Sequence, residues 1–441
     1  MFVTGRLPLL VALGVLPVVL LSSALSAERG DAAPWLVAGG WALLCLVVVA
    51  VDVAAAADPR AVTLTRRVPA RGRLGERVDT QLVLANTGTR TVRGLARDAW
   101  QPTAGAPAER LSLDVPAGER RTLPVPLLPR RRGELVSEFV VLRSTGPLGL
   151  AGRQHRITSR AAIRVLPPFM SRRHLPSRIA RLRELDGNTS VQVRGQGTEF
   201  DSLREYVRGD DVRSIDWRAT ARSQGTMLRT WRPERDRHVV IVIDTGRTSA
   251  ARVDDGTRLD ASMEAALLLA ALATRAGDHV HLVMFDRVVR ARVTGVDGPA
   301  LLPALVDAMA PIDPQLIDTD WDAALAQVRA LTSRPSLVVL LTAQDAPEAA
   351  RGFLGSLPAL ARRTRVIVGS VTDTGLADAA ARRSGSEEVY RAAAAEHTLR
   401  DAARVGSAIE RAGADVIAAG PEDLPPRVSD RYLELKAAGR L

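Results

Sequence analysis

Residues 195–250 read GQGTEFDSLREYVRGDDVRSIDWRATARSQGTMLRTWRPERDRHVVIVIDTGRTSA, and they hold two features that organise the chain. The first is a dense polar run in which acids alternate with arginines around two aromatic residues, Tyr206 and Trp217. The second is an uninterrupted apolar strand that leads to Asp244 and a turn with glycine and threonine. A hydrophobic core cannot hold such charges unpaired. We therefore look for function in this stretch.

Downstream of Arg237, continuous apolar strands alternate with helical segments, a pattern typical of a doubly wound α/β domain. Strands are predicted at residues 238–243, 279–285, 288–293, 337–342 and 366–371, and around Val416. Helices are predicted at residues 258–276, 299–309, 320–331, 347–361, 399–412 and 425–435. The carboxyl ends of the parallel strands should form the binding edge of this sheet.

Asp244 leaves the first of these strands at that edge. With Thr248 on the same turn and Thr319 before a later helix, it would supply the hard oxygen ligands that suit Mg²⁺ or Mn²⁺. A further ligand should follow residue 342, but Ala343 stands there, and Asp345 is a displaced substitute. The alternative is a turn typical of the fold that binds no metal.

Upstream, residues 61–167 show apolar residues at every second position, separated by turn signals rich in glycine, proline and asparagine. Short alternating strands at this spacing predict an immunoglobulin-like β-sandwich. Arginines then cluster over residues 172–183, where they would either contact anionic headgroups or lie on a solvated linker helix.

Two apolar runs, residues 7–25 and 33–51, open the chain and predict a transmembrane helical hairpin. Arginines flank both outer ends, so the positive-inside rule places the rest of the chain in the cytoplasm, at the inner membrane. The alternative for the first run is a cleaved signal peptide, because Ala24-Leu25-Ser26 resembles a cleavage site.

The composition excludes several classes of protein. Hydrophobic residues make up 46% of the 441 residues, which excludes a disordered polymer. The net charge is +11, but the basic residues form no motif with interleaved aromatics, so we expect no nucleic-acid partner. The single cysteine, Cys45, excludes a disulfide framework within the chain.

The Asp244 turn resembles the metal-ion-dependent adhesion site of von Willebrand factor A domains, whose motif is Asp-x-Ser-x-Ser. Asp244 matches the aspartate and Thr248 the second serine, while Gly246 stands at the first serine and Ala343 at the aspartate of the third loop. Thr319 matches the threonine of the second loop. The resemblance implies a degenerate cation site.

The segment GTEFDSLREYVRGDDVRSIDWRATAR, residues 197–222, resembles the hallmark of the domain-of-unknown-function 58 family. Members are similar in plan over nearly the whole chain. The plan implies two transmembrane helices, a β-rich domain, the hallmark and a von Willebrand factor A-like domain. With the residue patterns above, it divides the chain into two transmembrane helices (1–57), a β-sandwich (58–168), a basic linker with the hallmark (169–236), the von Willebrand factor A-like domain (237–420) and a C-terminal helix (421–441). The resemblance also implies a protein partner, a MoxR-type AAA+ ATPase, and work in complex assembly or of a chaperone-like kind.

The hallmark segment itself admits three interpretations. Its charge pairs could fix the linker on the α/β domain, its aromatic residues and arginines could recognise a partner, or two of its acids could serve as acid and base in a hydrolase. The residues predicted for partner or interdomain contact are Glu199, Asp201, Arg204, Tyr206, Asp210, Asp211, Arg213, Asp216 and Trp217. We expect a scaffold or adaptor without catalytic residues, with a hydrolase or an outward-facing adhesion protein as alternatives.

Overall fold

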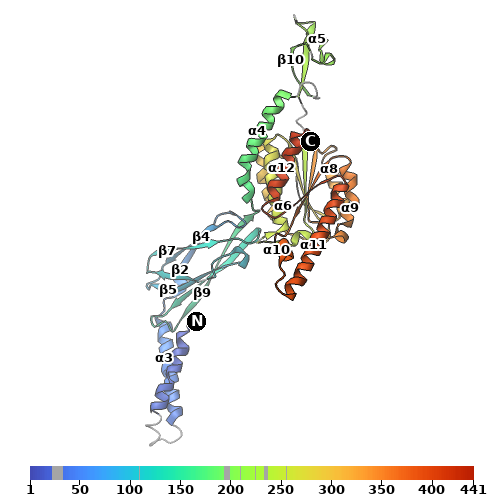
Figure 1. Ribbon diagram of the computed structural model, residues 1–441. Coiled ribbons are helices and arrows are strands. Elements are labelled where there is room, and N and C mark those ends of the chain that lie inside the picture. The colour runs from blue at the N-terminus through green and yellow to red at the C-terminus, as the bar shows by residue number, and fades with distance from the viewer. Residues whose placement is uncertain are drawn as a thin grey trace. The chain divides into compact units, whose positions relative to one another are not determined.

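The structure is a computed structural model, which describes residues 1–21, 33–108, 110–192, 199–208, 210–223, 225–232, 237–254 and 256–441. These residues form two compact units, 1–166 and 167–441. Figure 1 traces the elements of both along the chain. The first unit holds apolar helices and mostly antiparallel sheets, and the second holds a strand hairpin and a mostly parallel sheet, so the chain is multidomain.

The first unit contains a β-sandwich whose two sheets enclose one hydrophobic core. One sheet has the order β2-β4-β7, and the other has the order β1-β9-β8-β5-β6 with β3 beside β9. The strands are β1 (Phe2–Val3), β2 (Val62–Arg67), β3 (Arg71–Arg73), β4 (Val78–Asn86), β5 (Val92–Trp100), β6 (Leu111–Val115), β7 (Arg120–Leu127), β8 (Gly133–Thr145) and β9 (Ala151–Leu166). Buried and exposed residues alternate along β4, as expected where one face of a strand meets a core.

Two stretches of apolar helix adjoin this sandwich. They are α1 (Arg6–Leu13), with helical residues continuing to 21, and α3 (Ala33–Ala55). The two lie side by side, because the Trp41 indole occupies the space into which a side chain at Gly14 would project. Within the described ranges, one helix, Pro34–Ala61, is long and apolar enough to cross a membrane, with a mean hydropathy of 2.4. The first predicted span runs on into residues 22–25, which lie outside the described residues.

Asp52 joins α3 to the turn between β8 and β9. Its carboxylate is fully buried and accepts three backbone hydrogen bonds, from the amides of Leu148 (2.8 Å), Leu150 (2.8 Å) and Ala151 (2.9 Å). Gly146 is needed in this turn, because a Cβ there would clash with Asp52. Both oxygens of the buried acid are therefore hydrogen-bonded to the sandwich.

The second unit is built around a six-stranded sheet with the order β16-β15-β12-β17-β18-β19. β16 is antiparallel to β15, and the other neighbours are parallel. The strands are β12 (His238–Asp244), β15 (His279–Phe285), β16 (Val289–Val293), β17 (Leu337–Leu341), β18 (Arg365–Val371) and β19 (Asp415–Ala419). The helices are α4 (Leu175–Gln192), α6 (Arg258–Arg275), α7 (Leu301–Met309), α8 (Trp321–Leu331), α9 (Pro347–Ala361), α10 (Gly375–Ala381), α11 (Ser386–Arg411) and α12 (Leu424–Ala437).

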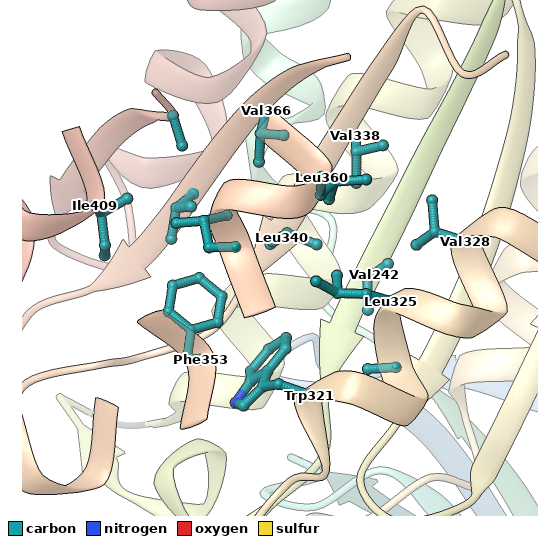
Figure 2. Close-up of a cluster of buried hydrophobic side chains, with 14 of the residues drawn as sticks. Val242, Trp321, Leu325, Val328, Val338, Leu340, Phe353, Leu360, Val366 and Ile409 are labelled. Carbon is teal, nitrogen blue, oxygen red and sulfur yellow. The ribbon is translucent and has the colours of Figure 1, made fainter. Parts of the chain in front are cut away.

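Helices cover both faces of this sheet. On one face, α8, α9 and α11 pack over alternate residues of the central strands, and Trp321 meets Phe353 edge to face with ring centroids 4.7 Å apart (Figure 2). On the other face lie α6 and α12, which contact each other and the strands. The central strands are continuously apolar because both of their faces are buried.

α11 begins at Ser386, so the predicted start at residue 399 is wrong. Its first half buries only small side chains, Ala392 and Ala395, and therefore lacks the stripe of large apolar residues that marks an amphipathic helix. The other predicted helices of this sheet begin and end within a few residues of the observed ones.

Candidate functional site

The polar run identified from the sequence folds as a small strand hairpin. β10 (Glu199–Glu205) pairs antiparallel with β11 (Met227–Arg232), and the connection contains a 3-10 turn, η5 (Val212–Ser214), and a one-turn helix, α5 (Trp217–Thr220). We call residues 199–232 the hallmark hairpin. Its connection is tied to the strands by backbone hydrogen bonds, from Tyr206 to Thr226 (2.7 Å) and from Asp216 to Met227 (2.9 Å).

Three acids of the hairpin stabilise its own turns. Asp210 forms an ion pair with Arg204 (2.7 Å) and accepts the amide of Val207 (3.0 Å). Asp211 accepts the amide of Arg213 (3.0 Å) at the start of η5. The hydrogen bond to Asp210 raises the pKa of Arg204.

The third acid, Asp216, caps α5. One carboxylate oxygen accepts the amides of Arg218 (2.9 Å) and Ala219 (3.0 Å), and the other accepts from the Arg229 guanidinium (2.7 Å). The Ala219 amide and the Arg229 side chain lower the pKa of Asp216. Aspartate is a preferred residue at this capping position.

The same connection exposes large apolar side chains. Trp217 is 70% exposed, Val207 61% and Val212 60%, and the exposed arginines 208, 213 and 218 lie among them in the sequence. The Trp217 side chain is therefore available for contact with another protein or with an adjoining part of this chain. Tyr206 is half-buried, and the side chains of Glu199 and Asp201 lie outside the described residues.

The second candidate site is at the carboxyl end of β12. The carboxylate of Asp244 is buried and accepts four hydrogen bonds, from the Gly246 amide (2.8 Å) and from the hydroxyls of Thr248 (3.2 Å), Thr319 (2.5 Å) and Thr342 (2.6 Å). The three residues predicted as metal ligands thus lie together. In the described structure every one of these donors is neutral, so no cationic side chain balances this buried charge.

Thr342 was missed as a member of this site, although the register of the sheet identifies it. Ile243 pairs with Leu341 in the parallel strands β12 and β17, so the next residues, Asp244 and Thr342, lie side by side. From the sequence, the further ligand is instead expected after Thr342, at Ala343 or Asp345. Asp345 does not substitute there, because it forms an ion pair with Arg258 (2.5 Å).

A second buried acid next to this site has its charge balanced. Asp286, at the end of β15, accepts from the Arg290 guanidinium (2.6 Å), from the amides of Arg287 and Val288, and from the Thr245 hydroxyl. Burial alone would raise the pKa of Asp286, but these hydrogen bonds outweigh it, so the pKa lies below the ordinary value. Asp286 thus has a cationic partner, whereas the hydrogen-bond donors to Asp244 are neutral.

The Asp244 cluster fits a hard cation through its chemistry, with one carboxylate and three hydroxyls as oxygen donors. Gly246 keeps the cluster compact, because a Cβ there would clash with the Thr319 hydroxyl. A serine at this position, as in the adhesion motif, would not fit this arrangement. Across the described ranges, no group of three or more His, Cys, Asp or Glu side chains could hold a metal, so any cation site here depends on a single acid.

Comparison with known proteins identifies a family domain. Residues 202–411 match a family model described as "Protein of unknown function DUF58", so the chain contains a DUF58 family domain. The match takes in most of the hallmark hairpin and the sheet as far as the end of α11. No curated protein matches the sequence.

Several solved structures resemble a quarter of the chain. They include a chain of the complex of zinc 2-glycoprotein and prolactin inducible protein from human seminal plasma, at 13% identity over 24% of this chain and 92% of that chain, with a TM-score of 0.20. The CARDB domain of a Pyrococcus furiosus protein matches at 12% identity over 24% of this chain and 94% of that chain, with a TM-score of 0.18. β-Glucosidase from Listeria innocua matches at 12% identity over 24% of this chain and 16% of that chain, with a TM-score of 0.17. No activity or partner follows from these similarities.

Proposed function

We propose that this protein is a membrane-anchored cytoplasmic scaffold or adaptor that binds a protein partner through the hallmark hairpin. The partner is a MoxR-type AAA+ ATPase, and the role is complex assembly or chaperone-like work. In this proposal the sandwich is an immunoglobulin-like spacer, and the sheet of the second unit belongs to a von Willebrand factor A-like domain. No catalytic step is assigned.

The observation that carries the proposal is the exposure of Trp217 on a hairpin whose acids stabilise its own turns. Tryptophan and arginine are enriched among the residues that dominate binding energies at protein interfaces. Trp217 is 70% exposed, and Arg213 and Arg218 are exposed close to it in the sequence. Because Asp210 and Asp216 are each paired with an arginine, they are poor candidates for the free acid and base of a hydrolase.

A two-span hairpin as the membrane anchor is supported by where its ends attach. β1 pairs with β9 at Gly152, and the Thr4 hydroxyl donates to the Gly149 carbonyl (2.6 Å). Asp52 binds the same β8–β9 turn at the other end of the helical region. The chain thus leaves the sandwich and returns to it at one place, as a hairpin requires, and the flanking arginines favour the cytoplasm for that place.

A weak Mg²⁺ or Mn²⁺ site at Asp244 is part of the proposal. Asp244, Thr248 and Thr319 would hold the ion, with Thr342 beside them. A bound ion would supply the positive charge that the described side chains do not place next to this carboxylate, and it would offer a partner protein a coordination position.

Capture of the partner from membranes tests the proposal. Tagged full-length protein is purified from gently solubilised membranes as wild type, as Trp217→Ala and as Tyr390→Ala, and the co-purifying proteins are identified by mass spectrometry. Tyr390 is a matched control, since it is an 80% exposed aromatic residue on α11. We expect an AAA+ ATPase with wild type and Tyr390→Ala, and a loss of at least tenfold with Trp217→Ala, as for a residue that dominates an interface. Absence of any ATPase, or equal recovery by all three, would refute the proposed role.

A further inference from the structure

Three arginines meet on the face of the β5–β8–β9 sheet that points away from the sandwich core. They line a cavity of about 180 Å³, whose walls are formed by Leu95, Arg97, Arg110, Val141, Arg143 and Gln154. Strand register explains the grouping, because Leu95 lies opposite Arg143 and Arg143 opposite Gln154, while Arg97 lies opposite Val141 in the next row. Arg110 precedes β6, the neighbour of β5.

The positive charge of this cavity is not balanced within the described chain. No ion pair joins Arg97, Arg110 or Arg143 to an acid there, whereas the nearby Arg93 pairs with Asp114 (3.6 Å) and Arg160 with Glu134 (3.7 Å). Burial and the charges of Arg110 and Arg97 lower the pKa of the Arg143 guanidinium. Like charges held together in this way repel one another unless an anion lies between them.

Arg143 is held in place before any ligand arrives. Its Nε atom donates to the Gln154 side-chain oxygen (2.8 Å), and its guanidinium lies over the Phe2 ring, 5.0 Å from the centroid. Both contacts leave the terminal nitrogens of Arg143 available to the cavity. A side chain that is already ordered loses less conformational entropy when a ligand binds.

We propose that this cavity binds a phosphate-type oxyanion, held by Arg97, Arg110 and Arg143. Three guanidinium groups, two on strands and one just before β6, suit a tetrahedral anion with several oxygens and up to two charges. They suit a carboxylate less well, because it has two oxygens and one charge. The phosphate belongs either to a free anion or to a lipid headgroup. A lipid headgroup is one of the two sources because Phe2, which contacts Arg143, lies in β1, and β1 leads directly into the apolar helix α1.

The experiment uses full-length protein in dodecyl maltoside micelles, which contain no phosphate. Its thermal unfolding is followed during titration with inorganic phosphate, with phosphatidylglycerol at the same phosphate concentration, and with sodium chloride at matched ionic strength. Arg97→Gln and Arg110→Gln each remove one guanidinium from the cavity. Arg121→Gln is the matched control, because it removes the same charge from an exposed position on the other sheet.

We expect phosphate or phosphatidylglycerol to raise the Tm of wild type and Arg121→Gln beyond the effect of chloride. Arg97→Gln and Arg110→Gln should be at least as stable as wild type without anion, and their apparent affinity should fall about tenfold or more. The anion that acts at the lower concentration identifies the source of the phosphate. The proposal is overturned if neither anion exceeds chloride in wild type, or if the cavity variants respond as Arg121→Gln does.

Discussion

The Asp244→Asn variant distinguishes between two interpretations of the Asp244 turn, a cation site and a turn typical of the fold that binds no metal. Asparagine keeps the shape of the side chain and one acceptor oxygen, which can still receive the Gly246 amide and the Thr319 hydroxyl. Its NH₂ group would face the hydroxyls of Thr248 and Thr342, which can rotate to accept. The substitution therefore removes the buried charge while it preserves most of the hydrogen bonds.

The expected effect of Asp244→Asn on the free energy of unfolding differs with and without a cation. In EDTA, the variant no longer pays the cost of burying a charge, but it loses charge-assisted hydrogen bonds. Because these two effects oppose each other, its free energy of unfolding should be within about 1 kcal/mol of the wild-type value. With Mg²⁺ at about ten times its Kd, wild type should gain about 1.4 kcal/mol and the variant nothing. That gain corresponds to a rise in Tm of roughly 3–5 °C for a unit of this size.

The assay is thermal unfolding of the second unit within the full-length protein, with up to about 10 mM MgCl₂ or MnCl₂, a range that covers weak oxygen-ligand sites. Choline chloride at equal ionic strength replaces the metal salt in the reference samples. Thr248→Val is a second variant, which removes one proposed ligand but keeps the acid. A wild-type Tm that is equal in metal and in choline chloride would show that the turn binds no cation. A shift that persists in Asp244→Asn would place the ion elsewhere.

Two further predictions concern buried acids. Asp52→Ala should destabilise the first unit by about 3 kcal/mol, because the backbone amides of Leu148, Leu150 and Ala151 lose a charged acceptor. Denaturant unfolding measures this, with Asp79→Ala at a 73% exposed site as the control, and equal stability of the two variants would contradict the role of Asp52. The folded pKa of Asp286 lies below its ordinary value of 3.8, so its carboxylate stabilises the fold above that value and this contribution is lost as the pH falls through the folded pKa. Arg290→Gln should reduce the loss of stability at low pH, which urea unfolding between about pH 2.5 and 7 measures. An unchanged pH dependence of stability would show that Arg290 does not lower the pKa of Asp286.

The central strands β12 and β17 of the α/β sheet could be predicted from the sequence because each is a continuous apolar run bounded by polar turns. The same rule places Asp244 at the end of its strand, and the structure brings Thr248 and Thr319 to it. Thr342 could not be recognised from its own strand, because its position beside Asp244 depends on the register between β12 and β17, which are far apart in the sequence. The binding of a cation stays a prediction.

The hydrogen-bond partners of the acids in the hallmark hairpin could not be predicted from the sequence. From the sequence, Asp210, Asp211 and Asp216 are equally able to face a partner, an adjoining domain or a substrate, because composition does not say which polar group each carboxylate meets. In the structure they accept from amides only a few residues away, and the exposed groups are Trp217 and its neighbours. Local capping of this kind is visible in the sequence only when the start of so short a turn or helix is known.

The pairing of β1 with β9 has a consequence for the order in which the chain folds. Residues 2–3 complete an edge of the sheet by pairing with β9, which is synthesised about 150 residues later, after both apolar helices. Membrane insertion of the helices must therefore leave residues 2–3 near the place where β9 forms, or that edge remains unpaired. A soluble fragment that starts at residue 58 would lack both β1 and Asp52. It would have an open strand edge at 151–152, and three backbone amides would lack their Asp52 acceptor, so we expect it to associate through that edge.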